Sequence, residues 1–127
     1  MTETQLAKTG AMSQLSIYHN PRCSKSRQTL QLLSEHGQQP EVIEYLKTPL
    51  DITDVLALKD KLGVDSVRDF MRVKEAEYKE LNLAKVEDEK ALAKAITDHP
   101  KLLERPIVVK DGRAKIGRPP ENVLELL

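Results

Sequence analysis

The chain contains a single cysteine, Cys23, among its 127 residues. An internal disulfide is therefore excluded, because it would need a second cysteine. No signal-peptide pattern is recognisable in the sequence, and a lone cysteine is typical of proteins from reducing compartments. We expect a cytoplasmic protein in which the thiol of Cys23 stays reduced.

The chain also lacks net charge and long apolar runs. Its 20 lysine and arginine residues balance 20 aspartate and glutamate residues, which excludes the broad positive surface of sequence-independent nucleic-acid binders. No apolar run approaches the roughly 18 residues of a membrane-spanning helix. We expect neither a nucleic acid nor a membrane as partner, and any anion would have to be bound by a local group of cations.

Motifs for metals and nucleotides are missing as well. A zinc site needs three or four clustered cysteine, histidine or carboxylate ligands, whereas Cys23, His19, His36 and His99 are too widely spaced to provide them. The glycine-rich loop of dinucleotide-binding proteins is also absent. We therefore expect no metal and no bound cofactor.

The hydrophobic patterns predict an α/β fold. Residues 1–13 are polar and aperiodic, which indicates a flexible tail, and residues 14–127 have the length of one domain. The expected elements are a strand at Leu15–Tyr18, a helix from Ser24 to Gly37, a strand within Glu41–Leu46, a hairpin around Asp111-Gly112, and a last helix after Pro119-Pro120. The first two strands should be parallel, and the positive φ angles of the hairpin turn should fall on Asp-Gly.

Residues of about 50–104 interrupt this order with helical patterns alone. Gly63 closes the first of these helices, and Ser66 and Asp69 have the spacing of a capping box that opens the next. No Gly/Ser-rich linker flanks the segment, so we interpret it as a helical insertion in the domain. The predicted order is β-α-β, helical insertion, β-β-α, with a mixed four-stranded sheet.

Cys23 lies where the first strand turns into the first helix. The initial N–H groups of a helix lack intrahelical partners and the helix dipole is positive there, so a thiolate is favoured over a thiol. An inert, buried packing role is the alternative for a lone cysteine, but Arg22, Ser24, Lys25 and Ser26 surround Cys23. We therefore expect an exposed, reactive thiol.

Four separated motifs resemble the glutaredoxin-coupled arsenate reductase family, whose fold is thioredoxin-like. They are Ile17–Arg27, which includes Cys23, then Ser66–Arg72, His99–Val109 and Gly117-Arg118-Pro119. The resemblance covers nearly everything after Leu15, and the ending at Leu127 is similar to the short, less characterised branch of the family.

This resemblance implies a set of site residues. Cys23 would be the nucleophile, His19 and Ser26 would assist its thiolate, and Arg72, Arg105 and Arg118 would bind the oxyanion. The Arg105–Pro106 bond would be cis. Glutathione and glutaredoxin would donate the electrons, and arsenate would be reduced to arsenite through a thiol–arsenate intermediate on Cys23. We expect the protein to act as a monomer.

Other functions stay open at this point. A glutathione-dependent monothiol reductase of the same fold could act on another substrate, whereas dithiol chemistry is excluded because Ser26 stands where the second cysteine of a redox pair would lie. A redox-type transcription regulator that binds RNA polymerase is the non-enzymatic alternative, and it too usually needs that second cysteine. Phosphatase-like arsenate reductases carry an arginine six positions after the nucleophile, where this chain has Thr29. Arg27 could approach the anion or lie on the surface.

Overall fold

The computed structural model of the chain describes residues 15–127, so the predicted tail at residues 1–13 lies outside the described part. Two compact units make up this part. One combines residues 15–44 with Arg105–Leu127, and the other is Tyr45–Glu104.

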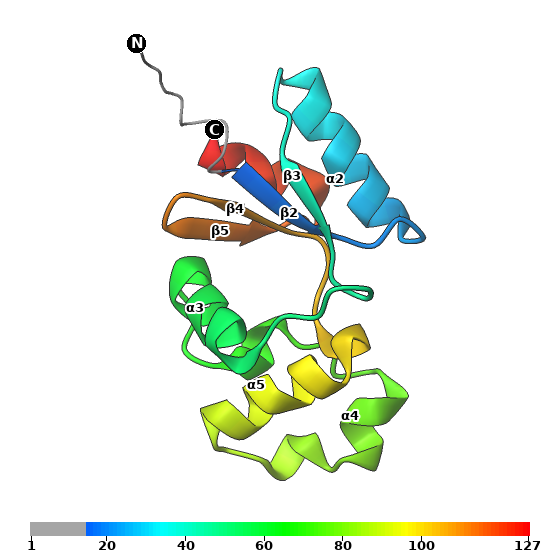
Figure 1. The fold of residues 1–127 in the computed structure, drawn as a ribbon, viewed down its shortest axis with the longest axis vertical. Helices are drawn as coiled ribbons and strands as arrows, with labels where there is room; N and C mark the ends of the chain where they lie inside the picture. The colour runs from blue at the N-terminus through cyan, green and yellow to red at the C-terminus, as the bar shows by residue number, and fades with distance from the viewer. Residues whose placement is uncertain (1–14) are drawn as a thin grey trace. The chain divides into compact units, whose positions relative to one another are not determined.

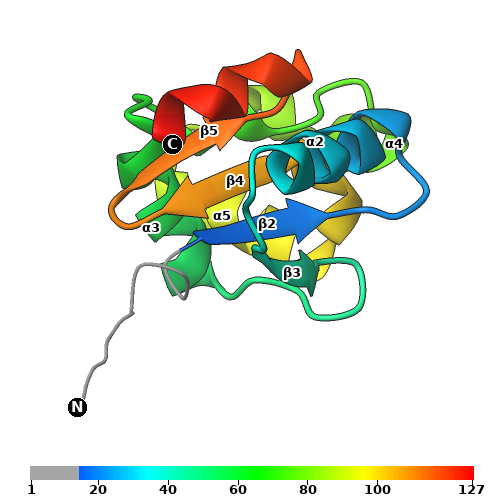
Figure 2. The same ribbon diagram turned by 90° about the horizontal axis from the view of Figure 1, so that it is seen from above.

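A mixed four-stranded sheet forms the first unit. Its strands are β2 (Leu15–His19), β3 (Glu41–Glu44), β4 (Ile107–Lys110) and β5 (Arg113–Ile116). They are arranged in the order β3-β2-β4-β5, as Figure 2 shows. Strands β2 and β3 are parallel, while β4 is antiparallel to both β2 and β5. The predicted α/β fold, with its mixed sheet and parallel first pair, is confirmed.

Two helical elements cover the same face of this sheet (Figure 1). They are helix α2 (Ser24–Glu35) and the 3₁₀ helix η5 (Pro120–Leu126). The sequence pattern predicted a last helix but not its 3₁₀ geometry. Strand β2 alternates buried and half-buried residues, because successive side chains point to opposite faces of a sheet. The buried core between sheet and helices consists of Leu15, Ile17, Leu33, Val108, Val123 and Leu126.

Strand β3 lies within the expected range Glu41–Leu46. It ends at Glu44 because its register with β2 stops at the pair His19–Glu44, beyond which the chain of the partner strand turns at Asn20. The expectation for the hairpin turn is only partly right. In the hairpin turn the positive φ falls on Asp111, at 56°, and not on Gly112. Aspartate tolerates this left-handed conformation better than most residues do.

The second unit is built of helices, apart from one short β-bridge. Its α-helices are α3 (Ile52–Leu62), α4 (Ala76–Glu80) and α5 (Glu89–Asp98), and its 3₁₀ turns are η2 (Val67–Phe70), η3 (Leu83–Lys85) and η4 (Pro100–Leu102). Gly63 closes α3 in the left-handed conformation, and Ser66 and Asp69 form the expected capping box. The Glu89 carboxylate accepts bonds from the Val67 N–H (2.7 Å) and the Ser66 hydroxyl (2.9 Å), which ties η2 to α5.

A short antiparallel bridge joins the residues after η2 to the end of this helical unit. Met71 pairs with Leu103, the Arg72 N–H donates to the Leu102 carbonyl (2.7 Å), and the Glu104 N–H donates to the Phe70 carbonyl (2.9 Å). The bridge therefore places Arg72 beside the residues that lead out of the unit.

Candidate functional site

The loop from His19 to Cys23 presents the thiol at the start of α2. The Cys23 N–H donates to the Asn20 carbonyl (3.0 Å), which closes the turn, and the Asn20 side chain accepts from the Arg22 N–H (3.0 Å). Cys23 itself is the N-cap of α2, with an extended backbone. The sulfur therefore lies at the positive end of a helix of 12 residues, as the sequence predicted.

The thiol is buried, which corrects the expectation of an exposed one. Only 9% of the Cys23 surface is accessible. Such burial raises the pKa of a thiol. The pKa of Cys23 is nevertheless held below its ordinary value by the N–H groups of Ser26 and Lys25 and by the hydrogen bond and charge of the Arg105 guanidinium. Donors directed at the sulfur thus more than offset desolvation, and Cys23 combines limited access with thiolate character.

Arg118 is the second guanidinium at this sulfur. Its Nη2 lies 3.7 Å from the Cys23 Sγ, and its Nε donates to the Arg105 carbonyl (2.7 Å). The peptide bonds Arg105–Pro106 and Arg118–Pro119 are both cis. The structure therefore brings Cys23, Arg105 and Arg118 together from three segments of the first unit, and the expected cis bond at Arg105 is confirmed.

His19 and Ser26 form a buried polar pair next to the loop. The Ser26 Oγ lies 2.7 Å from the His19 Nδ1 and accepts from the Asn20 N–H at 3.0 Å. Neither side chain is more than 5% exposed. Burial lowers the pKa of His19, the Glu44 carboxylate raises it, Arg27 lowers it, and the net shift is downward. This pair joins the end of β2 to the first turn of α2, which are the two elements on either side of Cys23.

Arg72 belongs to the helical unit, whereas Cys23, Arg105 and Arg118 belong to the first unit. Its Nε pairs with Glu75 and its Nη1 with Glu104, both at 3.2 Å. Its side chain is 23% exposed, so the ion pairs are only partly screened by solvent. Any anion that binds Arg72 has to compete with these carboxylates.

Three residues contribute to the site in ways that the sequence analysis did not assign. Arg27 donates from Nη1 to the Pro21 carbonyl (2.9 Å), so it holds the loop from the outside. Asn20 bonds through both backbone and side chain, a role that its turn-forming chemistry could have suggested. At Gly117 an added Cβ would lie 2.6 Å from the Thr29 Oγ1 and 2.9 Å from the Pro106 Cγ. The glycine that precedes Arg118-Pro119 in the sequence could have indicated this close approach, because glycine has no Cβ.

Within residues 15–127, no group of three or more histidine, cysteine, aspartate or glutamate side chains could hold a metal ion. The same part of the chain contains no helix with the length and apolarity that crossing a membrane requires.

The fold and the site define a thioredoxin-like α/β protein with an activated thiol at the start of its first helix. A solved structure described as an arsenate reductase from Vibrio cholerae superimposes with a TM-score of 0.88 at 53% identity, covering 93% of this chain and 100% of that one. The family model described as the ArsC family matches residues 18–126. The chain belongs to the ArsC family.

Two relatives extend this comparison. An uncharacterised Escherichia coli K12 protein, YfgD, is 58% identical over 115 residues, which are 90% of this chain and 97% of that protein. An arsenate reductase of Neisseria meningitidis is 51% identical over 117 residues, which are 91% of this chain and 100% of the relative. Both matches span nearly the whole length of this chain and of the relatives.

Proposed function

We propose that this protein reduces arsenate to arsenite, with Cys23 as the nucleophile and with glutathione and glutaredoxin as electron donors. The observation that carries the proposal is the placement of Arg118 Nη2 3.7 Å from a thiol whose pKa is lowered, in part by the Arg105 guanidinium. The names of relatives at 51% and 53% identity support the choice of arsenate as substrate.

The donor set suits a tetrahedral oxyanion. Guanidinium groups bond two oxygens at once in a fixed plane, and for such anions they are better matched than lysine. Arg105 and Arg118 would hold arsenate at the sulfur, and Arg72 would complete the set on leaving Glu75 and Glu104. Because the chain has no net charge, attraction of arsenate would come from these converging cations in a partly dry site.

The first chemical step forms a sulfur–arsenic bond. The Cys23 thiolate attacks arsenic(V), an arsenate oxygen takes two protons and leaves as water, and a thiol–arsenate ester remains. The thiolate, and not the thiol, is the nucleophile. His19 and Ser26 would keep the loop and the first turn of α2 in the geometry that this attack needs.

Two external thiols complete the reduction, because the chain has no second cysteine. Glutathione replaces one hydroxyl of the ester, releasing a second water. A glutaredoxin thiol then attacks the glutathione sulfur and breaks the bond between that sulfur and arsenic. The electron pair of this bond stays on arsenic, which becomes arsenic(III). Water finally releases arsenite and restores Cys23, leaving a mixed disulfide of glutathione and glutaredoxin. The protein would perform this cycle as a monomer in the cytoplasm, whose reducing thiol pool supplies the electrons.

A glutathione-dependent monothiol reductase acting on another substrate is the second candidate. A single buried thiol of lowered pKa would also serve thiol exchange. Such a reaction needs no oxyanion site, so the two arginines at the sulfur favour arsenate. The two candidates differ in whether arsenate is consumed.

The test is arsenate-dependent NADPH consumption in an assay that couples glutathione, glutaredoxin and glutathione reductase. We expect turnover that requires both arsenate and glutaredoxin and that is abolished in Cys23→Ser. Activity that persists in Cys23→Ser would contradict the proposal. Glutathione oxidation without any arsenate dependence would favour the monothiol reductase.

A further inference from the structure

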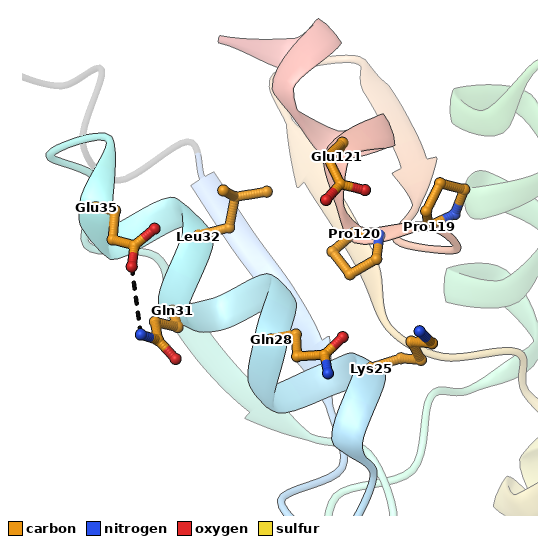
Figure 3. A pocket seen from close by; sticks show the side chains of 8 residues that line it. All are labelled: Lys25, Gln28, Gln31, Leu32, Glu35, Pro119, Pro120 and Glu121. Atoms are coloured by element: carbon orange, nitrogen blue, oxygen red, sulfur yellow. Dashed lines mark hydrogen bonds between the residues drawn. The ribbon is translucent and has the colours of Figure 1, made fainter.

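An open groove of about 350 Å³ lies between α2 and the beginning of η5, within the first unit. Figure 3 shows Lys25 at the start of α2 near Pro119 and Pro120, with Leu32 and Glu121 further along the groove. Gln28 lies between these two ends, one turn after Lys25. The function proposed above assigns nothing to this groove.

The groove begins at the two segments that flank the thiol. Lys25 follows Cys23 by two residues, and its backbone N–H is one of the donors that lower the pKa of that thiol. Pro119 directly follows Arg118, whose guanidinium contacts the Cys23 sulfur. The groove therefore starts two residues from Cys23 and one residue from Arg118 along the chain.

We propose that this groove binds glutathione, the tripeptide thiol that enters the second step; the proposal rests on the function proposed above. Glutathione is an extended, polar molecule with a carboxylate on its glycine, next to the thiol-bearing residue, and an ammonium and a second carboxylate on its γ-glutamyl end. Its binding needs a polar groove in which a cationic group, an amide and a carboxylate follow one another along the length of the groove. Lys25, Gln28 and Glu121 provide these groups in that order.

The charges are complementary when the thiol points toward Cys23. The Lys25 ammonium, at the thiol end, would attract the glycine carboxylate, while Glu121, at the far end, would attract the γ-glutamyl ammonium. The Gln28 amide can bond the peptide groups in between. Leu32 and Pro119 provide the apolar surface on which the tripeptide backbone would lie.

The size of the groove favours a tripeptide over a protein surface. Three extended residues span about 10 Å, and the stretch of α2 from Lys25 to Glu35 is about 15 Å long at 1.5 Å per residue. Small-molecule sites begin at about 300 Å³, whereas a protein partner needs about 800 Å² of surface on each side. The groove is large enough to bind glutathione, but it is too small to bind glutaredoxin without further contacts.

Binding can be measured without any reaction. S-methylglutathione has no free thiol, so it reports on the groove whether or not the protein turns over arsenate. We expect its addition to the full chain to shift the NMR amide signals of 25–35 and 119–121. The variant Gln28→Trp places a large ring in the groove at an exposed helix position, and we expect it to weaken this binding about tenfold or more, which equals at least about 1.4 kcal/mol.

The matched control is Ser34→Trp, an exposed position of the same helix that does not line the groove. This variant should bind S-methylglutathione as the wild type does. In turnover, Gln28→Trp should raise the KM for glutathione about tenfold while leaving the KM for arsenate and the titration of Cys23 unchanged.

Each outcome separates the two proposals. Binding that is lost in Gln28→Trp and kept in Ser34→Trp supports the groove, even if arsenate turnover is absent and the proposed function fails. Shifts that miss the groove, or equal binding by wild type and Gln28→Trp, overturn the groove proposal while leaving the arsenate assay unaffected. If Gln28→Trp slows only the glutaredoxin step and binds S-methylglutathione normally, the groove contacts glutaredoxin and the glutathione assignment is wrong.

Discussion

The Arg118 Nη2 lies 3.7 Å from the Cys23 Sγ, although the two residues are 95 positions apart in the chain. The Arg118 Nε donates to the Arg105 carbonyl (2.7 Å), which fixes the direction of the guanidinium. A cation held in this way at a nucleophile is placed to bind a substrate anion as it reaches the sulfur.

The first prediction concerns the shape of this cation. Arg118→Lys keeps the charge but loses the planar fork, so we expect kcat/KM for arsenate to fall roughly 10- to 100-fold, as for a lost charged hydrogen bond of about 1.5–3 kcal/mol. Steady-state kinetics with arsenate measure the loss. Arg113→Lys is the control, because Arg113 is an exposed arginine of β5 bonded to the Glu125 carbonyl (2.8 Å). Equal losses in the two variants would argue against a role for Arg118 at the anion.

The second prediction concerns the pH dependence of Cys23. Its pKa is lowered in the folded protein, despite burial, by the N–H groups of Ser26 and Lys25 and by Arg105. We expect kcat/KM to rise with pH through this lowered pKa, and Arg105→Met to move the rise to higher pH. Ultraviolet titration of the thiolate measures the shift directly, since the chain has one cysteine. An unchanged titration in Arg105→Met would contradict the assignment.

The same shift affects folding stability. A thiol with a lowered pKa stabilises the folded state above the ordinary cysteine pKa, and this contribution disappears as the pH falls through the folded value. The stability difference between wild type and Cys23→Ser should therefore shrink toward acid pH. Urea unfolding at several pH values measures this trend.

The third prediction uses the buried His19. Its folded pKa is lowered, mainly by burial, from an ordinary value of 6.5. Below that value the unfolded chain binds a proton that His19 in the folded protein does not yet bind. The free energy of unfolding should therefore decrease as the pH is lowered from 6.5, until the pH is below the folded pKa. His19→Gln should remove this part of the acid sensitivity in urea unfolding. His36→Gln, at the exposed C-cap of α2, should keep it, and a loss in both variants would refute the role of His19.

The fourth prediction concerns the close approach at Gly117. An alanine Cβ there would meet the Thr29 Oγ1 at 2.6 Å and the Pro106 Cγ at 2.9 Å. We expect Gly117→Ala to cost about 1–3 kcal/mol of stability and to lower activity, because Arg118 is the next residue. Gly112→Ala has open space around the added methyl group and should be nearly neutral. Thermal unfolding of both variants gives the comparison, and equal melting temperatures would show that the contact relaxes without cost.

Much of the fold was predictable because local signals agreed with one another. The capping box at Ser66 and Asp69, the left-handed Gly63 and the strand patterns at Leu15 and Ile107 all correspond to observed elements. These features depend on residues close in sequence. The end of β3 was not predictable, because the partner strand fixes where its register stops.

The candidate site was only partly readable from the sequence. The position of Cys23 at a helix start follows from local pattern, but its 9% exposure does not, since the covering groups come from Arg105 and Arg118 far along the chain. Polar neighbours in sequence suggested an open setting, whereas the fold turns Ser26 inward to His19. Burial and long-range hydrogen bonds are properties of the tertiary structure.

A crystal structure of the protein soaked with arsenate tests the central claim most directly. We expect arsenic bonded to the Cys23 sulfur, with the guanidinium groups of Arg105 and Arg118 within hydrogen-bond distance of its oxygens and Arg72 released from Glu75 and Glu104 to join them. Arsenate bound elsewhere, or a Cys23 sulfur that stays unmodified while the arginines contact no oxygen, would contradict it.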